Sequence, residues 1–110
     1  MQEPTFFILT ALAGRPLHGY AVLQAVGELS KGRVSLRAGT LYAVLDRLTE
    51  GGLVVVDSEE AVQGRLRRYY RLTDAGAARL GVEVAKLRAN AAVAAARLRH
   101  HGHADPSPAV

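Results

Sequence analysis

The apolar positions of the first thirty residues predict two short helices. An apolar run lies between Pro4 and Gly14, and a proline near a helix start with a glycine just past its end predicts a helix over residues 4–13. After a Gly-Arg-Pro turn, apolar residues recur at spacings of four and three, which predicts a second helix over residues 18–29. The polar, glycine-containing residues 30–36 are predicted to form a loop.

A third apolar stripe predicts a helix with an unusual start. The segment RAGT, residues 37–40, places a cation, a glycine and a hydroxyl where the first turn begins. The pair Gly51–Gly52 ends the helix, because glycine suits the left-handed exit from a helix. The core-facing stripe between these ends consists of Leu41, Val44, Leu45 and Leu48.

The pattern then changes to that of two strands. Residues 53–58, LVVVDS, are rich in β-branched side chains, and residues 67–72, RRYYRL, are their predicted partner. The eight residues between them, 59–66, are mostly polar and include Gly64, so we expect a hairpin with a long tip. Alternation places Tyr70 and Leu72 on one face, with Tyr70 in the core.

A long helix follows, capped by either Thr73 or Asp74 and running to about Arg99. Its apolar residues alternate at spacings of three and four over about three heptads, which is typical of a helix–helix seam. The seam packs either within its own chain or, as we expect from its length, against a second copy of the chain. Its members are Ala77, Leu80, Val84, Leu87, Ala91, Ala94 and Leu98.

This order of elements predicts a fold that is mostly α with a small β-hairpin. Three short helices and a hairpin form a winged helix-turn-helix, whose third helix enters a DNA groove while the hairpin flanks the duplex. We therefore expect a DNA-binding domain over residues 1–72, a dimerisation helix over 73–100 and a frayed tail over 101–110.

Composition narrows the function further. The net charge of +4 and the pI near 10.0 favour a polyanionic partner, and twelve of the fourteen basic residues are arginine. No apolar run approaches the roughly 20 residues that span a bilayer, and the apolar segment at residues 6–13 lacks the features of a signal peptide. The absence of cysteine, and so of disulfides, is consistent with a cytoplasmic location. No enzyme motif and no cofactor site is evident, and we expect His100, His101 and His103 to belong to the tail rather than to a metal site.

The helical wheel identifies a candidate DNA-contacting surface. With Leu41 buried, Ala43 and Arg47 point outward, together with Asp46 and Glu50. Arg47 contacts either guanine or a phosphate, whereas the two acids either pair with it or lie outside the contact. On the hairpin, acids of the first strand are placed to pair with arginines of the second. The candidate DNA-binding residues are Arg37, Gly39, Thr40, Tyr42, Ala43, Arg47, Arg65, Arg67 and Arg68.

Three segments resemble the PadR family of bacterial transcriptional regulators: PLHGYAVLQAV at 16–26, GTLYAVLDRLTEGGLV at 39–54 and RLRRYYRLTDAG at 65–76. The resemblance implies a homodimeric winged-helix repressor that binds a palindromic operator in double-stranded DNA. It also implies dimerisation through the C-terminal helix with the first helix, and in some members a flat aromatic effector between the subunits. The expected interface residues are Phe6, Phe7, Leu80, Val84, Leu87, Ala91, Ala94 and Leu98.

The sequence departs from the family pattern at two points. Arg37–Ala38 stand where the family often has Ser-Pro, so Ser35 or the backbone must cap the third helix. The chain also lacks tryptophan, so the indole stacking of ligands in some relatives does not carry over. The main alternative function is a winged helix that binds another protein without specific DNA binding. We expect His18 to hydrogen-bond the first turn of its helix, and Tyr20 to contact either phosphate or a neighbouring helix.

Overall fold

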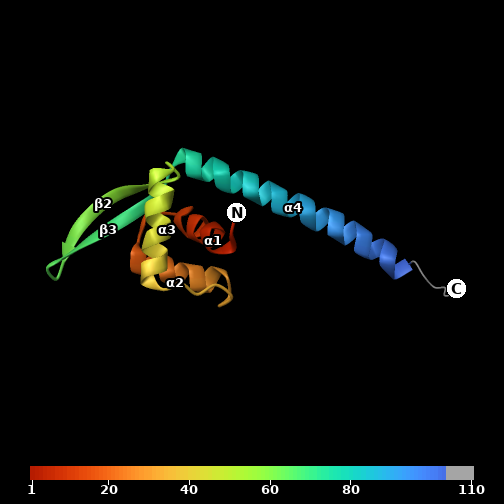
Figure 1. Ribbon diagram of the computed structural model, residues 1–110, viewed down its shortest axis with the longest axis horizontal. Coiled ribbons are helices and arrows are strands. Elements are labelled where there is room, and N and C mark those ends of the chain that lie inside the picture. The colour runs from red at the N-terminus through yellow and green to blue at the C-terminus, as the bar shows by residue number, and fades with distance from the viewer. Residues whose placement is uncertain (104–110) are drawn as a thin grey trace. The chain divides into compact units, whose positions relative to one another are not determined.

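A computed structural model describes residues 1–103 of the chain. It divides into two units, the first covering Met1–Leu80 and the second beginning at Gly81. In the first unit, three helices gather at the base of a β-hairpin that projects away from them (Figure 1). This is the winged helix-turn-helix that the sequence predicted, with a long C-terminal helix after it.

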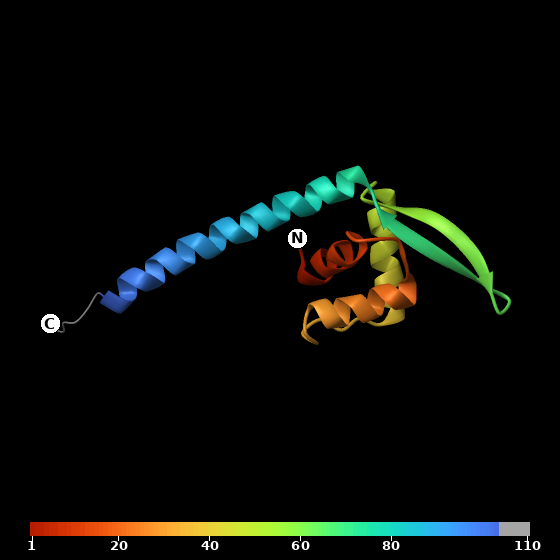
Figure 2. The ribbon, with the colours of Figure 1, turned by 180° about the vertical axis from the view of Figure 1, so that it is seen from behind.

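The three short helices follow the predicted apolar stripes closely. They are α1 (Glu3–Leu12), α2 (Gly19–Leu29) and α3 (Ala38–Glu50), and Figure 2 shows them together from behind. Their stripes meet in one core, which the wing closes with Val54 and Tyr70. The fully buried side chains of this core are Ile8, Leu9, Val22, Val26, Leu41, Leu45 and Val54.

The end of α3 is fixed by its two glycines. Gly52 has φ +77°, the left-handed conformation that glycine adopts without strain. The Gly52 amide donates to the Thr49 carbonyl, and the Leu53 amide donates to the Leu48 carbonyl. These two bonds form a Schellman motif, which satisfies carbonyls that the helix end would otherwise leave without partners.

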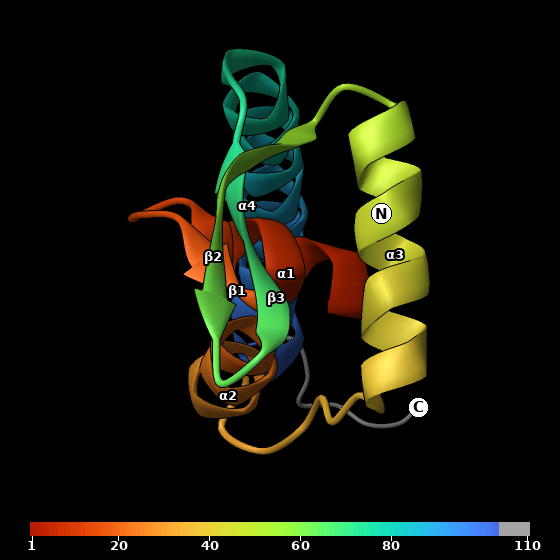
Figure 3. The same cartoon turned by 90° about the vertical axis from the view of Figure 1, so that its left-hand side faces the viewer.

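The sheet has three antiparallel strands rather than the two that were predicted. They are β1 (Leu17–His18), β2 (Val54–Val62) and β3 (Arg65–Leu72), in the order β1-β3-β2. Figure 3 shows the hairpin of β2 and β3 facing the viewer. No sequence pattern indicated β1, because a two-residue strand carries no alternation and forms only by pairing with Tyr69 and Tyr70.

The predicted long tip of the hairpin is wrong. Val62 pairs with Arg65, which leaves only Gln63 and Gly64 in the turn. Both have positive φ, 51° and 77°, as a two-residue turn of type I′ requires. The polar residues that suggested a loop instead extend both strands, because their charged side chains face solvent and pair across the hairpin.

The last helix, α4, covers Asp74–His103. Thr73 is its cap, since its hydroxyl accepts the Gly76 amide at 2.9 Å and donates to the Gly52 carbonyl at 2.7 Å. The helix continues past the predicted end at Arg99 and includes residues 101–103 of the predicted tail, and residues 104–110 lie outside the described part. Among residues 1–103, no helix has both the length and the apolar character needed to cross a bilayer.

Candidate nucleic-acid interface

The outward face of α3 is open to solvent, as the wheel predicted. Arg37 occupies the cap position before the helix and makes no side-chain capping bond, and Ser35 does not replace it. The first-turn amides of α3 are therefore left without a side-chain acceptor among the described residues. A Cβ at Gly39 would meet nothing within 4 Å, so the backbone itself is accessible there. The exposed residues of this face are Arg37, Gly39, Thr40, Tyr42, Ala43, Asp46, Arg47 and Glu50.

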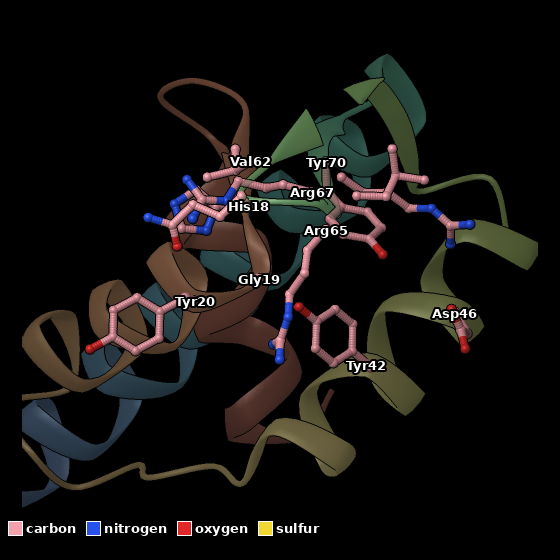
Figure 4. A pocket seen from close by; sticks show the side chains of 12 residues that line it. His18, Gly19, Tyr20, Tyr42, Asp46, Val62, Arg65, Arg67 and Tyr70 are labelled. Carbon is pink, nitrogen blue, oxygen red and sulfur yellow. The ribbon is translucent and has the colours of Figure 1, made fainter. Parts of the chain in front are cut away.

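A hollow of about 850 Å³ lies between α3, the start of α2 and the wing (Figure 4). It brings four predicted residues together, Tyr42 from α3 and Arg65, Arg67 and Arg68 from β3. The other predicted contacts lie outside the hollow, on α3 or, for Arg37, at the cap before it. Its complete lining is His18, Gly19, Tyr20, Tyr42, Asp46, Val62, Gln63, Arg65, Leu66, Arg67, Arg68 and Tyr70.

Tyr42 is held where α3 meets the start of α2. A Cβ at Gly19 would overlap the Tyr42 hydroxyl, so the missing side chain of Gly19 makes the space for the phenol. The ring of Tyr42 remains 44% exposed toward the hollow. Tyr20 does not pack between helices, because it is 63% exposed and contacts Gln24 on its own helix.

His18 joins the wing to α2. Its Nδ1 accepts the Ala21 amide at 3.4 Å, which confirms the predicted capping role. Its ring meets that of Tyr69 edge to face, with centroids 5.4 Å apart. Burial lowers the pKa of His18, the charge of Arg67 lowers it further, and Glu60 opposes both. The sequence showed the cap but not the contact with the wing, since that contact depends on β1.

The wing pairs several of its charges internally. Arg68 donates to Glu59 at 2.9 Å, Arg71 donates to Asp57 at 3.2 Å, and the Tyr69 hydroxyl donates to Glu60 at 2.7 Å. The predicted cross-strand neutralisation is therefore confirmed. The hydrogen bond to Glu59 also raises the pKa of Arg68.

Two arginines of the wing keep their charge available. Within residues 1–103, Arg65 and Arg67 make no hydrogen bond or ion pair, and both line the hollow. In Figure 4 the Arg65 side chain extends from β3 toward Tyr42. Arg68 lines the same hollow with its guanidinium already bonded to a carboxylate, so the two unpaired arginines are the stronger candidates for binding an anion.

The expected interface residues differ in how much of each is exposed. Phe7 and Leu80 pack on the core of the first unit, and Phe6 and Val84 are half-buried. The remaining four, in the second unit, are exposed: Leu87, Ala91, Ala94 and Leu98. Within the described residues, no group of three or more His, Asp or Glu side chains is arranged to hold a metal ion, and this includes the histidines at the end of α4.

A family model described as the transcriptional regulator PadR-like family matches residues 8–82. The transcriptional regulator Rv3488 of Mycobacterium tuberculosis is 42% identical over 73 residues, which cover 66% of this chain and 64% of that protein. The chain thus spans less than two thirds of that relative.

Solved structures show the same fold. A PadR family transcription regulator from Clostridium difficile superposes with a TM-score of 0.73 at 22% identity, over 88% of this chain and 99% of that one. Bacillus subtilis PadR, solved in complex with operator DNA, gives a TM-score of 0.68 at 23% identity, over 76% of this chain and 48% of that one. The three segments quoted from the sequence all lie within the matched region, and the chain belongs to the PadR-like family of transcriptional regulators, which are not enzymes.

Proposed function

We propose that the chain is a sequence-specific DNA-binding repressor of the bacterial cytoplasm. The observation that carries this proposal is the accessible, partly cationic face of α3 beside two unpaired arginines of the wing. In this proposal α3 enters the major groove, while Arg65 and Arg67 contact the phosphates beside it. Bacillus subtilis PadR, a protein of the same fold, was solved in complex with operator DNA, which supports DNA as the partner.

The start of α3 suits close approach to the DNA backbone. Its free amides and the positive end of the helix dipole favour an anion, and Arg37 adds a full charge at the same place. Gly39 lets the backbone come near without a clash, and Thr40 supplies a hydroxyl. Further along the helix, Ala43 and Arg47 are exposed, and in this proposal they meet the base edges of the major groove.

The repressor acts as a homodimer in this proposal. Leu98 is 68% exposed and Leu87 is 48% exposed, and Ala91 and Ala94 lie between them on the same side of α4. A second copy that covers this side removes apolar surface from water. A twofold axis then presents two recognition helices to successive major grooves, about 34 Å apart on a palindromic operator. A small effector bound between the subunits releases DNA by favouring a different helix spacing.

Binding to DNA tests the proposal directly. Fluorescence anisotropy with a duplex that carries an inverted repeat from beside the protein's own gene is compared with a random duplex of equal length. We expect the repeat to bind at least about 1,000-fold more tightly at physiological salt, and binding to weaken steeply as salt rises. No binding to either duplex, or to heparin, at low salt would overturn the proposal and favour a protein-binding winged helix.

A further inference from the structure

The hollow beside the recognition helix contains one carboxylate without a partner. Asp46 is exposed on α3, one turn after Tyr42, and lines the hollow together with Arg65 (Figure 4). Within residues 1–103 it makes no hydrogen bond and no ion pair. Its charge therefore faces the space that, under the proposed function, receives the DNA.

The other acids around this surface are arranged differently. Asp57 and Glu59 are bonded to arginines of the wing, and Glu60 accepts the Tyr69 hydroxyl. Glu50, on the same helix as Asp46, is exposed but does not line the hollow. Asp46 is thus the unpaired acid of the hollow among the described residues, and its neighbour along the chain, Arg47, does not neutralise it.

An unpaired carboxylate has opposite effects on the two parts of a duplex. Phosphates repel it, and this repulsion acts on every sequence equally because each nucleotide carries the same charge. In the major groove, however, cytosine and adenine present amino groups that donate to a carboxylate, and a carboxylate accepting from cytosine N4 is an established pairing. The gain is therefore limited to sites that place such an amino group opposite Asp46.

We propose that Asp46 is a specificity-determining residue, which accepts a hydrogen bond from the exocyclic amino group of an operator base and weakens binding to all other DNA. This inference rests on the proposed function and deepens it. It assigns discrimination to Asp46 and affinity to the unpaired arginines around it. The carboxylate lowers the total affinity for DNA. It improves discrimination nevertheless, because it weakens binding to the far more numerous random sites.

Two variants of Asp46 test the proposal against a matched control. Asp46→Asn and Asp46→Ala remove the charge from an exposed position, and Glu50→Gln removes the same charge from the same helix outside the hollow. We expect the two Asp46 variants to bind a random duplex about fivefold more tightly at low salt, with a steeper dependence of log K on log salt. We expect their operator-to-random affinity ratio to fall at least about tenfold. Glu50→Gln should change either affinity less than about twofold.

The base contact is located by replacing each operator base pair in turn. A replacement that weakens the wild-type protein about tenfold but leaves Asp46→Ala unchanged marks the partner of Asp46, and the base lost there distinguishes cytosine from adenine. The inference is overturned if no position behaves in this way, if Asp46 and Glu50 variants respond alike, or if the operator-to-random ratio is unchanged. A wild-type protein that binds no duplex instead overturns the proposed function itself, so the two failures are distinct.

Discussion

At the scale of single residues, the charged side chains of the candidate site divide into those that already have a partner and those that do not. Arg68 and Arg71 donate to acids of the neighbouring strand, and those bonds compete with any phosphate. Arg65 and Arg47 have no such partner within residues 1–103. A count of arginines along the wing therefore overestimates the number of side chains that are free to bind an anion.

Arg47→Ala tests the outward face of α3. A bidentate contact to guanine predicts a loss of about 1–3 kcal/mol on the operator and little change on a random duplex. A contact to phosphate predicts a similar loss on both duplexes and a salt slope reduced by about one. Arg33→Ala is the control, since Arg33 pairs with Glu3 and carries the same charge. Unchanged binding to both duplexes would remove Arg47 from the interface.

Gly19→Ala tests the support of Tyr42. The added methyl would overlap the phenol hydroxyl, so the Tyr42 ring must leave its place or α2 must shift from α3. We expect a loss of about 1–3 kcal/mol in the free energy of unfolding, measured by urea denaturation. Gly27→Ala, on the same helix with open space around it, should be neutral or stabilising by up to about 1 kcal/mol. Equal effects at both glycines would show that the contact with Tyr42 is unimportant.

At the scale of elements, the sequence predicted what depends on local pattern and missed what depends on pairing. The stripes of α1, α2 and α3 located each helix to within about two residues, because one buried face is enough to mark it. The strand β1 and the tight turn at Gln63–Gly64 were missed. Polar residues in the hairpin suggested a loop, and only the register shows that their charges pair across the strands.

The same distinction applies to the candidate site. The exposed residues of α3 were predicted correctly from the wheel, since exposure follows from helical periodicity. The position of Gly19 under Tyr42 and the contact of His18 with Tyr69 were not predicted, because each joins elements that are distant in sequence. Neither residue type, taken alone, carries a signal of that contact.

The start of α2 makes stability depend on pH. Burial and the charge of Arg67 lower the pKa of His18 from its ordinary 6.5, although Glu60 opposes this and Tyr69 only covers the ring. The unfolded chain then binds more protons than the folded one just below pH 6.5, so stability is present above that pH and is lost as the pH falls. Protonation at Nδ1 also removes the acceptor for the Ala21 amide.

His18→Asn isolates this effect. Asparagine caps helices well but does not titrate, so the variant keeps an acceptor for the Ala21 amide. We expect the midpoint of thermal unfolding of the wild-type protein to fall between pH 7.5 and pH 5.5 by more than that of the variant. The comparison uses circular dichroism at constant ionic strength. Parallel loss in both proteins would assign the pH dependence to other groups.

At the scale of the whole molecule, the two units differ in how they satisfy their apolar residues. The first unit buries its stripes in one core. The second leaves Val82, Leu87, Val93 and Leu98 exposed, because a single helix has no other element of its own unit to cover them. The seam of Leu87, Ala91, Ala94 and Leu98 is continuous at spacings of four, three and four, as in helices that pack along their length.

Replacing both large residues of this seam tests dimerisation. Leu87→Glu with Leu98→Glu places charge where the proposed partner packs, and burying these carboxylates without partners costs far more than leaving them in water. We expect sedimentation equilibrium to show a dimer for the wild-type protein and a monomer for the double variant at the same concentration. The affinity of the double variant for the operator should also fall, because a monomer does not bind both half-sites together.

Ala92→Glu is the matched control for the double variant, since Ala92 is exposed on the side of α4 that carries Arg88, away from the seam. It should remain dimeric and bind the operator as the wild type does. Urea denaturation should give the double variant and Ala92→Glu similar stability at concentrations where both are monomeric, because none of the three positions belongs to the core of the first unit. A wild-type protein that stays monomeric at high concentration, or a double variant that still dimerises, would contradict the assignment of the seam, and the operator would then have to be read by one subunit at a time.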